Sequence, residues 1–373
     1  MEPALGPNPN KKPKLNQDEE AEQEPEDRLS SLPDSVIHHI LSFIDIKYAV
    51  QMSRVSPRYR HLWKSLAALN FDSKLFRSVA SFDKFVNLVN RLRDCRSKAV
   101  AITYRRRGTT DIQRLKSLVY VMQQGIRHLS MSPSESFRRR PLMCLPNDLF
   151  ENNHLLSCGL MRKKTDSGKV FNDISLLFNW SMLTTLRLEN VSFQTPGLLH
   201  CCSSEFKVGF SGCPNLKSLS LKHLVGGGLM RFHLDIPQVL DLTLACQCDV
   251  VVTAPKLVYF SFQANLPLRF CADNLASLEK VDFFGQLRDE KLKVGSSDLI
   301  NMLRQFSNAE SVTLAHDVLM VLSMVRSFSE HLPSPFPKLK SLKLKGLPSY
   351  MIDKAITYLL SGSSGAALVL ESS

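Results

Sequence analysis

A short pattern of apolar residues recurs along most of the chain and limits what the chain can fold into. The pattern is apolar-x-x-apolar-x-apolar, and it occurs ten times between Ala99 and Leu344. Because residues two apart point to the same face of a strand, each occurrence predicts a short strand with one buried face. Recurrence at a period of a few tens of residues predicts a stacked array of similar units rather than a compact globule.

The ten occurrences begin 18–33 residues apart, with a mean spacing of about 27. They are AVAITY (from Ala99), IRHLSM (Ile126), LLSCGL (Leu155), LTTLRL (Leu183), LKSLSL (Leu216), VLDLTL (Val239), LVYFSF (Leu257), LEKVDF (Leu278), AESVTL (Ala309) and LKSLKL (Leu339). The spacing is typical of leucine-rich repeats, which run to about 20–29 residues. Residues 69–373 are therefore predicted to form an irregular leucine-rich-repeat solenoid of the α/β class, with a parallel sheet on its concave face.

The segments between strands are expected to return on the outer side as helices or irregular turns. Two of them show a helical period. SFDKFVNLVNRL places Phe82, Phe85, Val89 and Leu92 on one face, and DIQRLKSLVYVM does the same with Ile112, Leu115, Val119 and Met122.

Residues 28–68, which precede the repeats, predict three short helices. DSVIHHILSF is the first and IKYAVQMSRV is the second. SPRYRHLWKSLAALN is the third, with Ser56 as its N-cap and Pro57 at its first position. A unit of this size is close to the smallest that a hydrophobic core alone can stabilise, yet apolar residues lie on more than one helical face. Such a unit either docks on the rest of the chain or binds another protein.

The first 27 residues predict a disordered tail, because they hold eight acidic residues, three lysines and little that is apolar. Lys11, Lys12 and Lys14 form a KKPK cluster that is either a nuclear-import signal or part of a solvated tail. The N-terminus has no apolar stretch typical of a secretory signal, and no run approaches the roughly 20 apolar residues that cross a bilayer. We therefore expect a protein of the nucleus, the cytoplasm or both, with no membrane partner.

The segment LSSLPDSVIHHILSFIDIKYAVQMSRVSPRYRHLWKSL resembles an F-box. Together with CPNLKSLSLKHL, APKLVYFSF and FPKLKSLKLKGL, it makes residues 27 to about 360 similar to plant F-box/leucine-rich-repeat proteins. Tyr59 stands where the family usually has tryptophan, and Pro57 replaces a commoner basic residue. Many relatives end in an FBD-type domain, which we expect to be missing or truncated here because the chain stops at ALVLESS.

The resemblance implies a substrate-recognition subunit of an SCF-type cullin–RING ubiquitin ligase. The F-box would bind a Skp-type adaptor, which connects to the cullin and the RING protein, and the repeats would hold a protein substrate. Alternatives are an adaptor-binding protein with a non-degradative scaffold role, or a small internal bundle that caps the solenoid. The adaptor contacts implied by the resemblance are Leu32, Pro33, Ile37, Ile40, Leu41, Val50, Ser53, Val55 and Trp63.

The net charge of +12 is unevenly distributed, since the tail carries −5 and the remaining residues carry +17. Because arginine matches phosphate geometry, clustered basic residues predict an acidic or phosphorylated partner, with solvated loops as the alternative.

Lys338, Lys340, Lys343 and Lys345 are expected to point outward from the last clear strand, and other exposed strand positions include Ser220, Tyr259 and Asp282. The candidate substrate-binding residues are three basic triplets after the first three repeat strands, Arg105, Arg106 and Arg107, then Arg138, Arg139 and Arg140, then Arg162, Lys163 and Lys164.

Other function classes have weaker support. Nucleic-acid binding is the least favoured alternative, because Tyr104 beside Arg105 is the only close pairing of an aromatic with a basic cluster. No catalytic motif is present, so we predict that the chain is not an enzyme and needs no cofactor. The nine cysteines lack zinc-site spacing, so no metal site is predicted, and reduced, buried thiols are expected.

Overall fold

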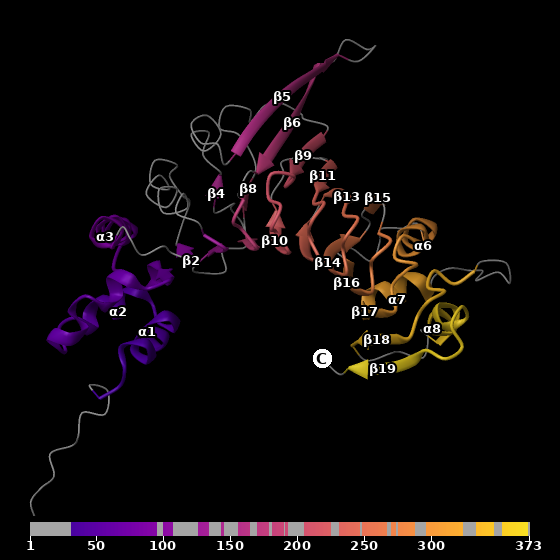
Figure 1. Ribbon diagram of the computed structural model, residues 1–373. Coiled ribbons are helices and arrows are strands. Elements are labelled where there is room, and N and C mark those ends of the chain that lie inside the picture. Colours follow the sequence, from indigo (N-terminus) through magenta and orange to yellow (C-terminus); the bar gives the residue numbers. More distant parts are fainter. Residues whose placement is uncertain are drawn as a thin grey trace, which may run out of the picture.

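The computed structural model is organised around one long parallel sheet that runs through most of the molecule (Figure 1). No helix among the described residues is long and apolar enough to cross a membrane. The structure describes residues 31–94, 100–106, 126–133, 143–144, 156–164, 170–178, 181–189, 191–192, 205–224, 231–246, 248–266, 270–273, 275–287, 296–323, 333–346 and 353–371.

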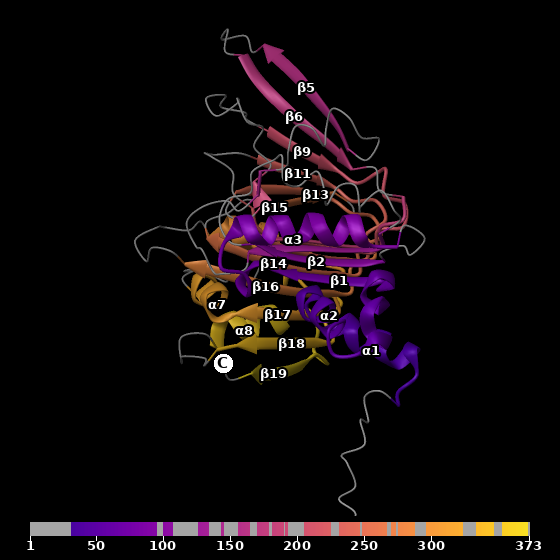
Figure 2. The ribbon, with the colours of Figure 1, turned by 90° about the vertical axis from the view of Figure 1, so that its left-hand side faces the viewer.

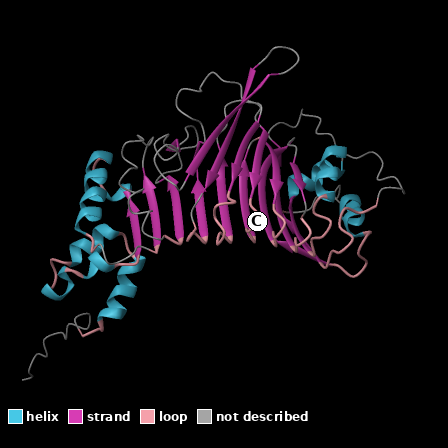
Figure 3. Cartoon of the chain, turned by 45° about the horizontal axis from the view of Figure 1, so that its top comes forward, coloured by secondary structure: helices cyan, strands magenta, loops and turns pink. Residues whose placement is uncertain are grey.

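Eleven strands form the long sheet, all of them parallel, in a curved row that follows the chain order (Figure 3). Every strand predicted from the repeat pattern belongs to it except LLSCGL. The strands are β1 (Ala68–Asp72), β2 (Ala101–Arg106), β3 (His128–Pro133), β7 (Thr185–Glu189), β10 (Ser218–Leu224), β12 (Asp241–Cys246), β14 (Tyr259–Leu266), β16 (Lys280–Leu287), β17 (Ser311–Ala315), β18 (Ser341–Lys345) and β19 (Ala367–Glu371).

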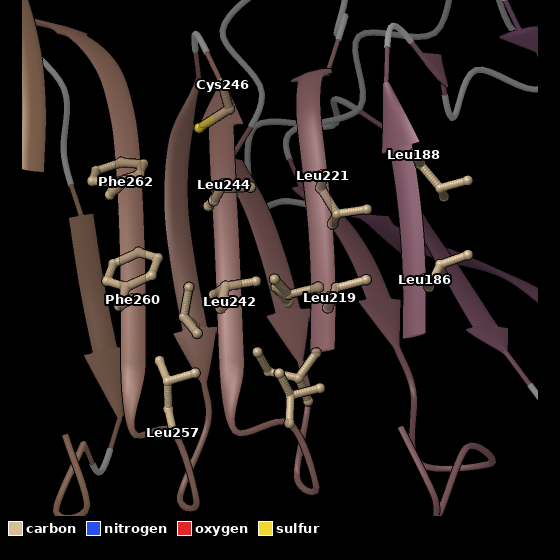
Figure 4. Packing of buried hydrophobic residues seen from close by; sticks show 14 of the residues in the cluster. Leu186, Leu188, Leu219, Leu221, Leu242, Leu244, Cys246, Leu257, Phe260 and Phe262 are labelled. Carbon is tan, nitrogen blue, oxygen red and sulfur yellow. The ribbon is translucent and has the colours of Figure 1, made fainter. Parts of the chain in front are cut away.

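The apolar positions of neighbouring strands lie in register across the sheet. Leu186 pairs with Leu219 and Leu219 with Leu242, while Leu188, Leu221 and Leu244 form a second row two residues further along. These side chains are at most 2% exposed, and Figure 4 shows both rows on one face of the sheet. Since side chains alternate along a strand, the residues between them lie on the opposite face, which we call the open face.

A second sheet packs behind the middle of the long sheet, where turns or helices were expected. Its order is β15 (Phe270–Asp273), β13 (Asp249–Thr253), β11 (Arg231–Asp235), β9 (Glu205–Gly209), β6 (Val170–Phe178) and β5 (Leu156–Lys164), with only the β5–β6 pair antiparallel. A further short pair joins β4 (Met143–Cys144) to β8 (Val191–Ser192). LLSCGL therefore lies mostly in β5, outside the long sheet, and the prediction that it is one of the concave strands was wrong.

Repeat spacing explains three strands of the second sheet, β11, β13 and β15. The return segments between β10, β12, β14 and β16 belong to intervals of 23, 18 and 21 residues, which leave too little chain for a full helix. The later intervals of 31 and 30 residues accommodate α6 (Ser296–Arg304) and α7 (His316–Ser323). A further helix, α8 (Asp353–Leu360), lies between β18 and β19.

The predicted early return helix is present as α3 (Val79–Leu92). Its buried face consists of Phe82, Val86 and Val89, whereas Phe85 is only partly buried and Leu92 is 46% exposed, so the predicted face was only partly right. The second predicted helix, in residues 111–122, lies outside the described residues, as does the tail with Lys11, Lys12 and Lys14.

The N-terminal unit consists of α1 (Asp34–Phe43), α2 (Ile46–Met52) and two 3₁₀ turns, η1 (Pro57–Arg60) and η2 (Leu62–Ser65). Ser56 caps η1 by accepting a hydrogen bond from the Arg58 N–H, as its N-cap role predicts. The single third helix predicted here was wrong, because the chain then extends into β1, with one further 3₁₀ turn, η3 (Ser73–Leu75), beyond it. Leu66, Leu69 and Phe71 follow the repeat pattern and make β1 the first strand of the array.

One contiguous hydrophobic core extends from Ile37 to Leu359, so the N-terminal unit and the repeats are packed as one body. Figure 2 shows α1 and α2 against the β1 end of the long sheet. In the middle, Phe270 of the second sheet lies with its ring centroid 5.4 Å from that of Phe260 in β14 and 5.3 Å from that of Phe306 after α6. These rings connect the two sheets to the helices.

Candidate functional site: an apolar helical face beside an open sheet face

Two apolar stripes run along α1, and only one of them faces the core. Ile37 and Leu41 are 2% and 3% exposed, and Ile44 packs partly against the same core. They are separated by four and three residues, the spacing of neighbours on one helical face. This stripe holds α1 against β1 and η2.

The second stripe, offset by one residue, is exposed. Val36 is 40% exposed, Ile40 41% and Phe43 73%, and they again lie four and three residues apart. Nearby in the chain, Tyr48 on α2 is 46% exposed and Val55 is 68% exposed. We call these five residues the apolar face. Fully burying one such side chain is worth about 1.5–3 kcal/mol, so the N-terminal unit leaves a substantial free energy of burial unused.

The structure divides the predicted adaptor residues between this surface and the core. Ile40, Val55 and Pro33 are exposed, while Leu32, Val50 and Ser53 are half-buried. Ile37, Leu41 and Trp63 are buried in the hydrophobic core. They are therefore not available for contact with a partner in this structure. The predicted set does not include the exposed Val36, Phe43 and Tyr48, although the helical spacing of the first two was a usable signal.

Polar contacts fix the elements that carry the apolar face. The Arg58 guanidinium donates hydrogen bonds to the Asp34 carboxylate, at 2.6 Å for the shorter one, and to the Leu32 carbonyl oxygen, so it ties η1 to the start of α1. Ser53 Oγ donates to the Val50 carbonyl at the end of α2. The Ser53 hydroxyl therefore has a local capping role.

A polar joint attaches the N-terminal unit to the first repeat strand. The Asp45 carboxylate accepts a hydrogen bond from the Asp72 backbone N–H at 2.7 Å and another from the Lys47 N–H at 2.8 Å, where it caps α2. The Asn70 side-chain amide donates to the carbonyl oxygens of Ser42 and Ile44. Partial burial raises the pKa of Asp45, against the lowering effect of the two N–H donors. These contacts orient the apolar face relative to the sheet.

On the open face, the lysines predicted to point outward from β18 have partners. Lys343 and Lys345 lie 3.9 Å and 3.8 Å from the Glu371 carboxylate, and Lys340 lies 2.7 Å from that of Glu310. Lys338 donates to the Asn308 side chain. Two carboxylates therefore serve three of these lysines, and the fourth, Lys338, has a neutral partner.

The described residues of the predicted basic triplets lie in two different sheets. Arg105 and Arg106 lie within β2, where Arg105 is 3.8 Å from Asp72, and Arg162–Lys164 form the far end of β5 in the other sheet. Arg107 and Arg138–Arg140 lie outside the described residues. That the three triplets together bind a substrate stays a prediction.

Tyr259 and Asp282 form a polar pair on the open face. The Tyr259 hydroxyl donates to Asp282 Oδ2 at 2.6 Å, and Lys280 Nζ lies 5.0 Å from the centre of the tyrosine ring. Desolvation, together with the neighbouring carboxylate, raises the pKa of Tyr259 to about 12. The phenol is therefore a neutral hydrogen-bond donor at physiological pH.

Comparison with known proteins gives two findings. Residues 29–69 match the F-box domain model. An F-box/LRR-repeat protein, a putative F-box/LRR-repeat protein and a putative FBD-associated F-box protein, all from Arabidopsis thaliana, are 26%, 26% and 28% identical over 91%, 86% and 79% of this chain. The aligned parts cover 70%, 66% and 69% of those relatives. The resemblance to plant F-box/leucine-rich-repeat proteins is confirmed, and with it the fold class.

Proposed function

We propose that this F-box/leucine-rich-repeat-like protein binds a Skp-type adaptor through its F-box and presents a protein substrate to a cullin–RING ubiquitin ligase with its repeats. The single observation that carries the proposal is the apolar face, an exposed stripe on a helix whose other stripe is already packed in the core. It lies within the residues that match the F-box domain. A partner that covers Val36, Ile40 and Phe43 gains the burial that the chain alone leaves unused.

The repeats would provide the second half of this function. The open face is continuous with β1, and β1 is joined to the F-box through Asp45 and Asn70. A segment bound on this face is thereby held in a fixed position relative to the adaptor. The ubiquitin transfer itself is assigned to the assembled ligase, with this chain acting as the recruiting subunit.

The adaptor contact is tested with a double variant, Ile40→Asp and Phe43→Asp. Both side chains are exposed, so the variant should fold normally and lose adaptor and cullin together in a pull-down with purified components. Substituting the buried Ile37 or Leu41 would confound binding with unfolding. The matched control is Leu88→Asp with Leu92→Asp on α3, where two apolar residues are 49% and 46% exposed and the adaptor should be retained.

Retention of adaptor by the Ile40→Asp, Phe43→Asp variant would contradict the proposed contact surface. The degradative role is tested separately, by affinity capture from cells with and without proteasome inhibition. A repeat-bound protein that accumulates on inhibition with the wild-type chain, but not with the double variant, supports substrate delivery. A bound protein whose level is unchanged in every condition indicates a scaffold instead.

A further inference from the structure

Two cationic residues on the open face form no ion pair within the described residues, unlike Lys343 and Lys345 of β18, which both lie within 4.0 Å of Glu371. We define a cationic patch by Arg187 on β7 and Lys222 on β10, both exposed. Neither has a carboxylate within the 4.0 Å ion-pair distance in the part of the chain that the structure describes. This contrast within one sheet singles out β7 and β10 as the place where positive charge is available to a partner.

The strand register gives the patch a defined geometry. Arg187 pairs with Ser220 on one side and Ser130 on the other, and Lys222 lies two residues beyond Ser220 on β10. Neighbouring strands are about 4.8 Å apart and two residues advance about 6.6 Å along a strand. The two cationic residues are therefore separated by about 8 Å at their Cα atoms, with short hydroxyl side chains around them.

The surroundings favour an anion over a neutral ligand. Arg127 and Lys217, at the beginning of β3 and β10, are also exposed. Among the described residues of β3, β7 and β10, Glu189 is the one carboxylate, and it lies opposite Lys222 in register without forming an ion pair. The four exposed cations therefore outnumber the carboxylates on these three strands. The serines Ser130 and Ser220 add hydroxyl donors without adding bulk, so the backbone of a bound segment can approach the sheet closely.

We propose that this patch binds an extended acidic segment of the substrate protein, with carboxylates at alternate positions. Alternate side chains of an extended segment point the same way and lie about 7 Å apart, close to the separation of Arg187 and Lys222. Each cation would then pair with one carboxylate of the bound segment, and the Arg187 guanidinium can form a bidentate pair. This inference rests on the proposed function, because it names the substrate class for the same repeat surface.

The test uses the full chain and three labelled peptides in a fluorescence-polarisation assay. The first carries glutamate at alternate positions, the second carries the same glutamates in one block, and the third carries glutamine in their place. The alternating peptide should bind most tightly and lose affinity as salt rises. Equal binding of the alternating and the block peptide would overturn the proposal.

Variants then locate the contact. Arg187→Ser with Lys222→Ser should weaken binding of the alternating peptide by about tenfold or more, since two charge-assisted contacts are lost. The matched control is Lys343→Ser with Lys345→Ser, which removes the same charge from two lysines paired with Glu371 and should leave the affinity unchanged. An equal loss in both variants would show a diffuse charge effect and overturn the assignment.

Two further probes test whether the patch prefers a phosphorylated peptide or a nucleic acid to an acidic segment. A peptide with one phosphoserine, or a single-stranded oligonucleotide, that binds more tightly than the alternating peptide would overturn the acidic-segment assignment. Adaptor binding is measured on the same samples. If the wild-type chain and both variants bind the adaptor but the alternating peptide is not bound, the patch inference fails while the F-box proposal stands. If the adaptor alone is not bound, the F-box proposal fails instead.

Discussion

Asp45 and Asp72 are joined by a 2.7 Å hydrogen bond from the backbone N–H of Asp72 to the side chain of Asp45, although both residues carry carboxylates. The contact does not bring the two carboxylates together, because Asp72 contributes only its main-chain N–H. The Asp72 side chain instead accepts a hydrogen bond from the Lys74 N–H and lies 3.8 Å from Arg105. One acidic residue at the start of α2 thereby links the F-box to the first strand of the repeats.

We expect Asp45→Ala to reduce the free energy of unfolding by about 1–2 kcal/mol, because it removes a helix cap and leaves the Asp72 N–H without its acceptor. Urea denaturation of the full chain measures the change. Asp34→Ala is the matched control, since it breaks an exposed ion pair with Arg58 and should cost less than about 1 kcal/mol. Equal losses in the two variants would mean that the joint is energetically unimportant.

Leu344 and Leu370 occupy equivalent positions on neighbouring strands, β18 and β19, but differ in burial. Leu344 is 1% exposed and Leu370 is 56% exposed. Leu344→Ala should therefore cost about 2–5 kcal/mol, and Leu370→Ala less than about 1 kcal/mol. Thermal or urea unfolding distinguishes them, and similar costs would indicate that Leu370 is covered in solution.

Gly346 follows β18 with a φ of 102°, and a Cβ added there would lie 3.1 Å from the Cβ of His316. Gly346→Ala should be destabilising by about 1–2 kcal/mol, because both the left-handed conformation and the close approach disfavour a side chain. A Cβ added at Gly365 would meet no atom within 4 Å, so Gly365→Ala serves as the control and should be nearly neutral. Unfolding curves that rank the two variants in the opposite order would refute this account.

Tyr259 should titrate near pH 12, above its ordinary value of 10.0, because desolvation and the Asp282 carboxylate both disfavour the phenolate. The stability associated with the neutral phenol is then complete below pH 10 and is lost as the pH rises through about 12. Ultraviolet difference spectra of the wild type and Tyr259→Phe isolate this group. Asp282→Asn should lower its pKa without restoring the ordinary value, since desolvation is the larger cause.

The repeat pattern predicted the long sheet because its two apolar rows are determined by local alternation. It missed β1, whose Leu66, Leu69 and Phe71 were assigned to the end of a helix although they fit the same pattern. The second sheet was missed for a different reason, since strands such as β11 and β13 lie in the segments between the repeat strands, where helices or turns were expected. The short intervals around Val239 and Leu257 were the usable signal, because they exclude a returning helix.

The candidate site was predicted less well than the fold. Sequence identified α1 as a helix with too many apolar residues, but a family pattern does not separate contact residues from the residues beneath them. Ile37 and Ile40 illustrate this, because they lie three residues apart on one helix, and one is buried while the other is exposed. Arg105 and Arg162 lie in different sheets, because a cluster of charges does not determine which sheet its strand joins.

The eleven parallel strands follow one another without a break, so positions along the long sheet are spaced at regular intervals. Each strand adds about 4.8 Å, so the far end of the sheet lies about 48 Å from β1 along the row. If the chain recruits substrates as proposed, a segment bound one strand further out would shift its neighbouring lysines by about 5 Å relative to the ligase. Under the proposed function, the choice of the modified lysine would then depend on which strand binds the substrate, and no hinge would be needed between the repeats and the adaptor.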